Sequence, residues 1–474
     1  MTSENKKITS RDVDFATWYN DILMNADLID YTNVKGSMII RPYGYAIWEN
    51  IQSILDKEFK RTGHKNIQMP MFIPESLLNV EKEHVEGFAP EVAWVTQGGS
   101  EPLEERMCVR PTSEVLFCEH FKKIIKSYRD LPLLYNQWCT IVRWEKTTRP
   151  FLRSREILWQ EGHTMHETEQ EAREETKRMF KIYEDFQRNV LALPVIVGRK
   201  TEKEKFSGAV ETYTIEAMMY DGVALQNGTS HYFGQGFASA FGIEYLNKEN
   251  KLVTPYQTSW GVSTRMIGAI IMTHSDDHGL VLPPKIAPIK VAIIPIGTNE
   301  EVLKKASEIK ENLEKEGITC LLDDSSKSPG FKFAEAEVKG YPIRLEIGMR
   351  DLEKNVLTLV RRDTLEKQEI HLDEIVIEVK ENLETIQENL YNRALERRNT
   401  MLYEAKNYDE FKELAQNKSG FIKINWCGKE TCELKIKEDT GLKSRCILED
   451  EAPNGPCICC KEEGKHKIYF GRQY

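Results

Sequence analysis

The sequence predicts an α+β protein whose largest part is built on a mainly antiparallel sheet. Two pairs of strand-like runs, within 136–163 and 212–226, are each joined by a turn-like segment, and consecutive hairpins pair their strands antiparallel. After residue 285, strands and helices alternate, which indicates a compact α/β unit. Six of the ten cysteines lie between Cys427 and Cys460 and mark a small third unit. We therefore predict domains over residues 1–285, 286–385 and 386–474.

Bulk composition agrees with a multidomain globular chain. A length of 474 residues suggests about three domains. The formal charge, 65 − 75 = −10, argues against a general nucleic-acid coat, although a local basic patch is compatible with it. The sequence contains no run of 18 apolar residues, and its N-terminus lacks the apolar core of a secretory signal. We therefore expect no membrane span and a cytoplasmic location.

The run 136–163 carries most of the polar groups of interest. Residues two apart share a face of a strand, so we expect Arg143 and Glu145 to face one way on the outgoing strand. Trp159, Glu161 and His163 should do the same on the returning strand. Arginine grips phosphate and carboxylate through paired N–H donors, which suits a nucleotide and a small carboxylate. The alternative is an amphipathic hairpin with a solvated charged face.

The remaining elements follow from periodicity and turn signals. The first block should contain a helix over 168–190 and strands over 212–219 and 223–226, which are joined by Asp221-Gly222. A proline-rich linker, 280–288, separates it from the second unit. There we expect strands at 289–296, 319–322, 343–347 and 356–360, a helix through 302–313, and a long helix over 376–390 that leads into the third unit.

Three further polar clusters lie in the first block, at 110–114, 226–231 and 259–265. Each has an ordinary structural interpretation. Thr112 or Ser113 can cap the helix that follows. Asn227-Gly228 is a turn signal, and a lone arginine at a strand-to-helix junction is usually exposed. The functional interpretation has Thr112 and Glu114 hydrogen-bonding a substrate ammonium.

Together with 36–44, these clusters resemble the three signature motifs of class II aminoacyl-tRNA synthetases. The first motif matches 36–44, the second matches 143–145 through Arg153, and the third matches 263–265. Four more stretches narrow the resemblance to prolyl-tRNA synthetases of the archaeal and eukaryotic-like form. These are Pro-Thr-Ser-Glu (111–114), Trp-Gln-Glu-Gly-His (159–163), Gln-Asn-Gly-Thr-Ser-His (226–231) and Tyr-Phe-Gly-Arg-Gln-Tyr (469–474). The resemblance covers essentially the whole chain.

The resemblance implies ligation of L-proline to tRNA(Pro) in two steps. ATP-dependent formation of prolyl-adenylate precedes transfer to the tRNA 3′ end. The substrate carboxylate attacks the α-phosphorus directly, so catalysis is mostly alignment and charge neutralisation, with Mg²⁺ on the phosphates. The first motif implies a homodimer. Two alternatives are an inactive relative that only binds tRNA and a synthetase for another amino acid. The intact arginines disfavour the former, and the lack of Cys or His metal ligands at pocket positions disfavours a threonine enzyme.

The resemblance also assigns residues. Arg143 and Arg265 are the implied catalytic residues, and Arg143 would bridge the proline carboxylate and the α-phosphate. The implied proline contacts are Thr112, Glu114, Arg143, Trp159, Glu161, His163 and His231. The implied ATP contacts are Arg143, Glu145, Arg153, Gln226, Thr229, Ser263 and Arg265. One position departs from the family, because Ile157 stands where an aromatic residue commonly stacks on adenine. The last residue, Tyr474, is implied to tuck toward the active site.

The second unit resembles the anticodon-binding domain of this subclass. Charged groups near strand ends can read the edges of splayed bases, so Glu346, Arg350 and Asp351 are predicted contacts, with ordinary surface charge as the alternative. The interval from His163 to Glu211 has no room for the large editing domain of bacterial-type enzymes. We therefore expect no built-in hydrolysis of mischarged alanyl-tRNA.

The cysteines of the third unit have zinc-site spacing. Cys427-x4-Cys432 and Cys457-x2-Cys460 predict a structural Zn²⁺ held by four thiolates; a metal-free remnant of such a site is the alternative. Cys459 competes with Cys460, which the x2 spacing favours, and Cys446 is predicted to be a spare. The scattered Cys108, Cys118, Cys139 and Cys320 should be buried small apolar residues. Residues 274–278 look like a metal cluster but are interpreted as a polar loop that closes a helix.

Overall fold

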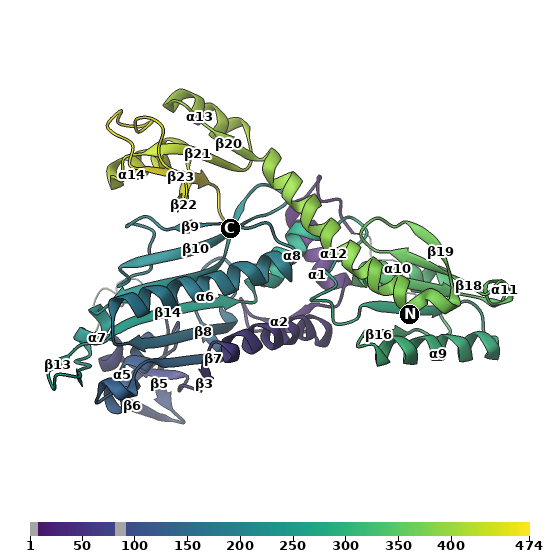
Figure 1. Ribbon diagram of the computed structural model, residues 1–474, viewed down its shortest axis with the longest axis horizontal. Coiled ribbons are helices and arrows are strands. Elements are labelled where there is room, and N and C mark those ends of the chain that lie inside the picture. The colour runs from purple at the N-terminus through teal and green to yellow at the C-terminus, as the bar shows by residue number, and fades with distance from the viewer. Residues whose placement is uncertain (1–7, 81–91) are drawn as a thin grey trace.

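The structure, a computed structural model, describes residues 8–80 and 92–474 and confirms the α+β prediction. Its centre is an eleven-stranded sheet in the order β20-β21-β23-β22-β9-β10-β11-β14-β8-β7-β3 (Figure 1). All neighbouring pairs are antiparallel except β20–β21 and β3–β7. The bounds are β3 (Lys65–Asn66), β7 (Leu133–Val142), β8 (Glu156–His166), β9 (Ile196–Arg199), β10 (Glu211–Met218), β11 (Ala224–Gly234), β14 (Tyr256–Ser263), β20 (Leu402–Glu404), β21 (Phe421–Trp426), β22 (Lys443–Leu448) and β23 (His466–Gly471).

The predicted hairpin of 136–163 is confirmed, with Gln137 of β7 opposite Glu161 of β8. The placement of Arg143 and Glu145 on the outgoing strand is wrong. Strand β7 ends at Val142, and the amide of Glu145 donates to the carbonyl of Arg143, two residues back, at 2.7 Å. This tight turn ends the alternation of faces and starts the irregular segment that leads to β8.

The second predicted hairpin, β10–β11, is confirmed and contains a bulge. Ile215 lies opposite Gly228, whereas Glu216 lies opposite Gln226, so Asn227 is the extra residue. Strict alternation would place Asn227 on the face of Thr229. The bulge puts Gln226 there instead, and Asn227 donates to Gln187 on the other face at 2.8 Å.

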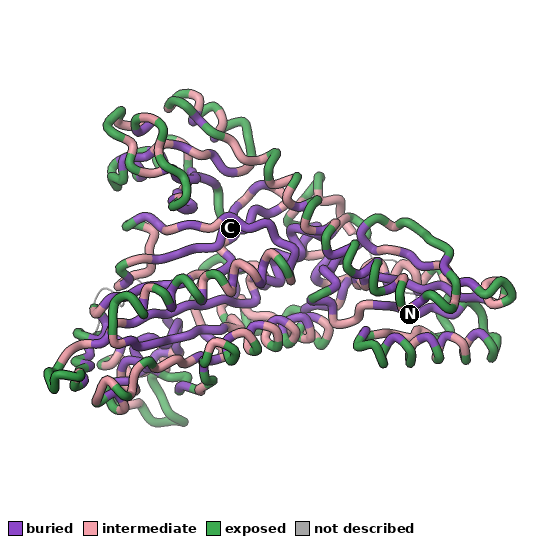
Figure 2. Tube along the Cα trace, in the orientation of Figure 1, coloured by how far each residue is buried: buried purple, intermediate pink, exposed green. Residues whose placement is uncertain are grey.

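One face of the central sheet packs on four long helices. These are α1 (Phe15–Asn25), α2 (Pro42–Arg61), α6 (Glu169–Asn189) and α8 (Arg265–His274). Their apolar side chains form one continuous core with residues of β10 and β14. Figure 2 shows this pattern as buried strands next to helices with exposed outer sides. Helix α6 confirms the helix predicted over 168–190, and a capping box between Thr168 and Glu171 begins it.

Smaller elements surround the sheet. Strands β1 (Ile29–Tyr31) and β2 (Met38–Ile40) form a hairpin before α2. A three-stranded sheet in the order β4-β6-β5 leads to α5. The other bounds are α3 (Glu75–Leu78), β4 (Phe72–Pro74), β5 (Ala93–Gly98), β6 (Glu101–Val109), α5 (Glu114–Ile124), η2 (Tyr128–Asp130), α7 (Gly236–Ala240), β12 (Tyr245–Leu246) and β13 (Leu252–Val253).

The second unit has its own five-stranded sheet, in the order β16-β15-β17-β18-β19, and its own apolar core. The strands and helices predicted there are confirmed, and 280–288 is irregular as expected. The bounds are β15 (Val291–Pro295), α9 (Glu300–Lys315), β16 (Cys320–Leu322), α10 (Pro329–Lys339), β17 (Ile343–Ile347), α11 (Met349–Glu353), β18 (Val356–Arg361), β19 (Lys367–His371), η3 (Leu372–Glu374) and α12 (Ile375–Thr400).

Helix α12 crosses the molecule from the second unit to the third (Figure 1). The third unit contributes β20 to β23 to the edge of the central sheet, where Ile447 of β22 pairs with Arg199 of β9. Its helices are α13 (Tyr408–Asn417) and α14 (Glu430–Thr440). The last strands of the chain therefore extend the sheet that its first half builds.

The fold also bears on the polar segment 274–278. Helix α8 ends at His274, whose Nε2 lies 3.0 Å from the carbonyl of Leu191, and Asp276 forms an ion pair with Arg362. The polar loop that closes a helix is therefore confirmed. Within residues 8–80 and 92–474, no helix is long and apolar enough to cross a membrane. The N-terminal stretch that we assessed for a secretory signal lies partly outside the described residues.

Candidate active site

A cavity of about 190 Å³ lies on the face of the central sheet that is turned away from α6. Strands β8, β10, β11 and β14 supply its floor, because alternate side chains of each strand point to this face. Its walls come from the segment before α5, the segment between β7 and β8, and the start of α8. Ten predicted site residues line it: Thr112, Glu114, Arg143, Trp159, Glu161, Gln226, Thr229, His231, Ser263 and Arg265.

At one end of the cavity lies the buried carboxylate of Glu161. It accepts hydrogen bonds from the Ser113 hydroxyl and from Gln137 Nε2 at 2.7 Å, and His163 Nε2 lies 3.1 Å away. Burial favours a higher pKa for Glu161, but the hydrogen bonds from His163, Ser113 and Gln137 outweigh it and hold the pKa well below its usual range. Glu161 is therefore an anion at neutral pH.

His163 does not line the cavity, which corrects the prediction that it does. It is fully buried behind Glu161 and stacks on Phe117, with 4.1 Å between the ring centroids. Alternation places it correctly on the face of Glu161, but β8 runs deeper into the molecule at this point. Its contact with the site is therefore made through Glu161.

A second buried carboxylate, Glu114, begins α5 beside Glu161. The hydroxyl of Thr112 donates to Glu114 and also lies 3.1 Å from Glu161, and Ser259 donates to Glu114 at 3.4 Å. Ser113 occupies the N-cap position of α5, but its hydroxyl binds Glu161 and makes no cap hydrogen bond. Helix capping therefore does not explain this motif. Two buried carboxylates at one end of a cavity suit a cationic ligand group.

Neutral groups form the next part of the wall. His231 Nδ1 lies 2.9 Å from the Thr212 hydroxyl, and Phe206 packs against the His231 ring with 4.6 Å between centroids. Burial lowers the pKa of His231 to about 3, so its imidazole is neutral at physiological pH. Phe206 was not predicted, because the lysine-rich turn that carries it has no periodicity. Thr212 was detectable from the alternation of its strand.

Two arginines, Arg143 and Arg265, also line the cavity. Arg265 donates to the carbonyls of Leu152 (3.0 Å) and Gln226 (3.1 Å). Burial and the charges of Arg143 and Arg153 lower the pKa of Arg265 to about 10, so it stays protonated at neutral pH. Arg143 donates to the carbonyl of Pro111 at 3.2 Å, and its guanidinium lies 5.1 Å from the Trp159 ring centroid. Arginine side chains that line a cavity suit a polyanion.

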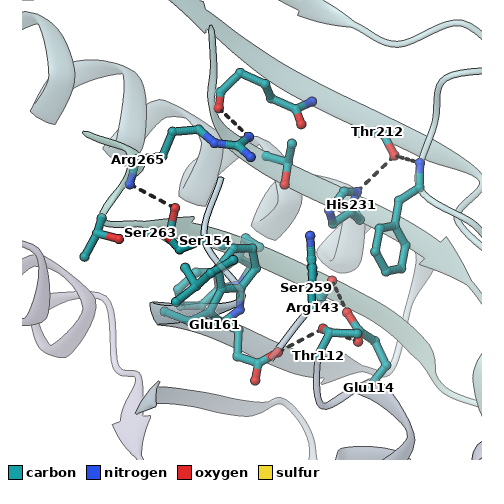
Figure 3. A pocket seen from close by; sticks show the side chains of 18 of the residues that line it. Thr112, Glu114, Arg143, Ser154, Glu161, Thr212, His231, Ser259, Ser263 and Arg265 are labelled. Atoms are coloured by element: carbon teal, nitrogen blue, oxygen red, sulfur yellow. Dashed lines mark hydrogen bonds between the residues drawn. The ribbon is translucent and has the colours of Figure 1, made fainter. Parts of the chain in front are cut away.

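Figure 3 shows these groups around one space. Arg265 and Ser263 lie at the left, Thr212 and His231 at the right, and Thr112 and Glu114 at the lower right, with Arg143 between them. Outside the enclosed cavity, Arg153 pairs with Glu145 at 3.4 Å. The aliphatic Ile157 lines the wall. Further lining residues that the sequence analysis did not select are Phe151, Leu152, Ser154, Glu204, Ser259, Trp260, Gly261 and Thr264.

A second candidate site lies in the third unit. The sulfur atoms of Cys427, Cys432, Cys457 and Cys460 all lie within 4.8 Å of one another. Cys427 Sγ is 3.7 Å from that of Cys432 and 3.6 Å from that of Cys460. Four thiolates at about 2.3 Å from a tetrahedral Zn²⁺ lie roughly 3.8 Å apart, so this cluster has the dimensions of a zinc site. Cys459 and Cys446 lie outside the cluster, as expected.

The residues predicted for anticodon contact lie together on β17 and α11. Glu346 is buried and binds Arg344 at 2.9 Å and Lys367 at 3.2 Å. The carboxylate of Asp351 accepts from the Gly348 amide at 2.7 Å at the start of α11. Arg350 is exposed. Two of the three side chains are therefore already engaged within the domain.

Family models match three parts of the chain. Residues 94–274 match the "tRNA synthetase class II core domain (G, H, P, S and T)". Residues 290–382 match the "Anticodon binding domain", and residues 408–474 match "Prolyl-tRNA synthetase, C-terminal". The first match contains β8, β10, β11 and β14, which form the floor of the cavity.

Whole-length relatives agree with these matches. The chain is 58% identical over 478 residues to a proline–tRNA ligase of Lachnospira eligens, with 100% of both chains covered. It is 58% identical over 469 residues to a proline–tRNA ligase of Clostridium novyi, with 98% of each covered. A crystal structure of prolyl-tRNA synthetase from Cryptosporidium parvum complexed with halofuginone and AMPPNP superimposes with a TM-score of 0.96 at 40% identity. That match covers 99% of this chain and 100% of the other. The chain therefore belongs to the prolyl-tRNA synthetases, class II enzymes that ligate proline to tRNA.

Proposed function

We propose that the cavity on the central sheet is where this enzyme joins L-proline to ATP as prolyl-adenylate, before the prolyl group passes to the 3′ end of tRNA(Pro). One observation carries the proposal. Two buried carboxylates, Glu114 and Glu161, line one end of the cavity, Arg265 lines the other, and Arg143 lies between them (Figure 3). Proline and ATP together present a cationic nitrogen at one end and a chain of phosphates at the other.

The proposed chemistry needs no nucleophile from the protein. A carboxylate oxygen of proline attacks the α-phosphorus, and pyrophosphate leaves with the electrons of the broken P–O bond. Arg143 neutralises the charge that develops between carboxylate and phosphate, and Arg265 holds the nucleotide from the start of α8. Mg²⁺ bound together with ATP would add to the positive charge that the two arginines supply.

The residue roles follow this division. For proline we propose Thr112, Glu114, Arg143, Trp159, Glu161 and His231, with His163 acting through Glu161. For ATP we propose Arg143, Glu145, Arg153, Gln226, Thr229, Ser263 and Arg265. Proline-dependent exchange of pyrophosphate into ATP tests the whole scheme, with a panel of other amino acids as the comparison. A preference for another amino acid, or tRNA binding without exchange, would contradict it.

Glu114→Gln is expected to raise the KM for proline about 10- to 100-fold, because a hydrogen bond to a charged group contributes roughly 1.5–3 kcal/mol. The KM for ATP should change little, because Glu114 lies at the other end of the cavity from Arg265. Both constants are measured by pyrophosphate exchange. Glu119→Gln, whose half-exposed carboxylate pairs with Lys123 on the same helix, is the matched control. An unchanged proline KM in the Glu114 variant would show that Glu114 does not contact proline.

For the second unit we propose binding of the tRNA anticodon arm, consistent with the family model that matches it. Of the three predicted contacts, Arg350 is the best placed, since it is exposed, whereas Glu346 and Asp351 are engaged within the domain.

We also propose the division into residues 1–285, 286–385 and 386–474, a cytoplasmic location and the absence of alanyl-tRNA hydrolysis. For the third unit we propose one structural Zn²⁺ on Cys427, Cys432, Cys457 and Cys460.

We further propose a homodimer that is formed through the first motif. The hairpin β1–β2 and the start of α2 carry exposed apolar side chains, among them Tyr31 (57% exposed), Val34 (63%) and Ile39 (52%). Contiguous exposed apolar groups mark protein interfaces. Ile39→Asp is expected to shift the species seen by sedimentation velocity from dimer toward monomer, whereas Ile377→Asp, an exposed apolar position on α12, should not. A wild-type monomer at micromolar concentration would contradict the proposal.

A further inference from the structure

A line of buried polar side chains runs from the cavity to the junction with the C-terminal strands. Gln226 Nε2 lies 3.1 Å from the Thr214 hydroxyl, and that hydroxyl lies 2.8 Å from Glu216 Oε1. Thr214 and Glu216 are fully buried on β10. The bulge at Asn227 makes the line continuous, because it turns Gln226 to the face of Thr214 and Glu216.

Glu216 is held as an anion between two cations. Lys200 Nζ lies 2.7 Å from its carboxylate and Arg445 Nη1 lies 3.8 Å away. Burial favours a higher pKa for Glu216, but Lys200 and Arg445 outweigh it and lower the pKa. An ionised carboxylate only accepts hydrogen bonds, so the single hydroxyl proton of Thr214 must point to Glu216. The Thr214 oxygen can then only accept from Gln226, which requires the NH₂ of the amide on that side.

We propose that Glu216, acting through Thr214, is a positioning residue that turns the side-chain oxygen Oε1 of Gln226 toward the bound nucleotide. The proposal rests on the ATP role proposed above for Gln226. Within the described residues, no protein group donates to the side-chain oxygen Oε1 of Gln226, and the side chain lines the cavity. A carbonyl oxygen takes a hydrogen-bond donor. The donors at the middle of ATP are the ribose hydroxyls, so the site assigns one of them to Gln226.

The C-terminal strands complete this arrangement. Arg445 belongs to β22; its carbonyl accepts from Lys200 at 3.0 Å, and its guanidinium donates to the side chain of Gln473 at 2.6 Å. The last residues also bind the start of β11, where the Ala224 amide donates to the carbonyl of Arg472 at 2.8 Å. The unit that carries the cysteine cluster thus helps to hold the nucleotide end of the cavity.

Thr214→Val removes the hydroxyl and keeps the shape, and Thr214→Ser keeps the hydroxyl. We expect Thr214→Val to raise the KM for ATP about tenfold, the size of one hydrogen bond, with little change in the KM for proline or in the melting temperature. Thr214→Ser should restore the wild-type KM. All constants come from pyrophosphate exchange. An unchanged ATP KM in Thr214→Val, or a parallel loss in both substrates together with a lower melting temperature, would overturn the proposal.

Two further measurements distinguish the positioning role of Glu216 from the ATP-binding role of Gln226 on which it rests. Gln226→Ala should also raise the KM for ATP; if it does not, the ATP role of Gln226 itself is false. If it does while Thr214→Val has no effect, only the positioning role fails. In wild-type enzyme, the KM for one of the two analogues 2′-deoxy-ATP and 3′-deoxy-ATP should be higher than the KM for ATP. In Thr214→Val this difference between analogue and ATP should disappear. An equal penalty in both enzymes would exclude the ribose contact.

Glu216→Gln provides a second variant of the same line. A neutral amide can donate to Thr214, which frees the Thr214 proton and allows the amide of Gln226 to turn over. We expect a raised ATP KM with an unchanged proline KM. This variant leaves Lys200 and Arg445 without their counter-charge and can therefore fail to fold. If it does, Thr214→Val, which retains all three charges, is the variant that tests the positioning role. An unchanged ATP KM in folded Glu216→Gln would contradict the proposal.

Discussion

Arg143→Ala should lower proline-dependent pyrophosphate exchange by about 10²–10³-fold, the effect of removing one preorganised donor from a site where charge develops. Arg143 lies between the carboxylates and Arg265, its guanidinium beside the Trp159 ring and its Nε bonded to the Pro111 carbonyl. That position allows it to meet a substrate carboxylate and a phosphate at once. The loss should fall mainly on the rate constant, because the negative charge at the reacting phosphorus grows during attack.

Arg61→Ala is the matched control, because its side chain is 65% exposed on α2 and only pairs with Glu58. It should leave exchange unchanged. Arg143→Lys is a finer test, because lysine keeps the charge but not the planar pair of donors. We expect it to recover only part of the lost rate. Exchange close to the wild-type rate in Arg143→Ala would show that the reacting atoms meet elsewhere.

Cys427→Ser should abolish zinc binding and loosen the third unit. Cys427 Sγ lies 3.7 Å from Cys432 Sγ and 3.6 Å from Cys460 Sγ, so its loss leaves three of the four thiolates. Structural zinc supplies on the order of 10 kcal/mol of folding free energy in small zinc peptides at neutral pH. The third unit has an apolar core of its own, so we expect lower thermal stability rather than complete unfolding. Elemental analysis and calorimetry measure the two effects.

Cys459→Ser is the control for this prediction. Cys459 is adjacent to Cys460 in the chain but lies outside the sulfur cluster, so its variant should retain one zinc per chain. Purified wild-type protein without zinc, or a Cys427 variant with unchanged zinc content, would contradict the four-thiolate site. Loss of zinc from the Cys459 variant would instead show that Cys459, and not Cys460, is the fourth ligand.

Local patterns were sufficient for the two hairpins of the site and for several strands and helices of the second unit. Alternation identified β10 and placed Trp159 and Glu161 on one face of β8, and the 3.6-residue period identified α6 and α9. The cysteine spacing selected the four residues whose sulfur atoms meet. Motif resemblance selected ten of the residues that line the cavity. The secondary-structure elements depend on residues that are close in the chain. The residues of the cavity were predicted from the family's motifs, because members of a family bring the same distant motifs together.

Long-range geometry decided the rest. A turn after Val142 took Arg143 and Glu145 off the strand, and the depth of β8 put His163 behind Glu161. The bulge at Asn227 turned Gln226, against strict alternation, toward Thr214. The pairing of β22 with β9 brought Arg445 to within 3.8 Å of Glu216, more than 200 residues away in the chain. Periodicity in a sequence reports which face a side chain takes, whereas register, bulges and strand order depend on packing between distant segments, which no local pattern encodes.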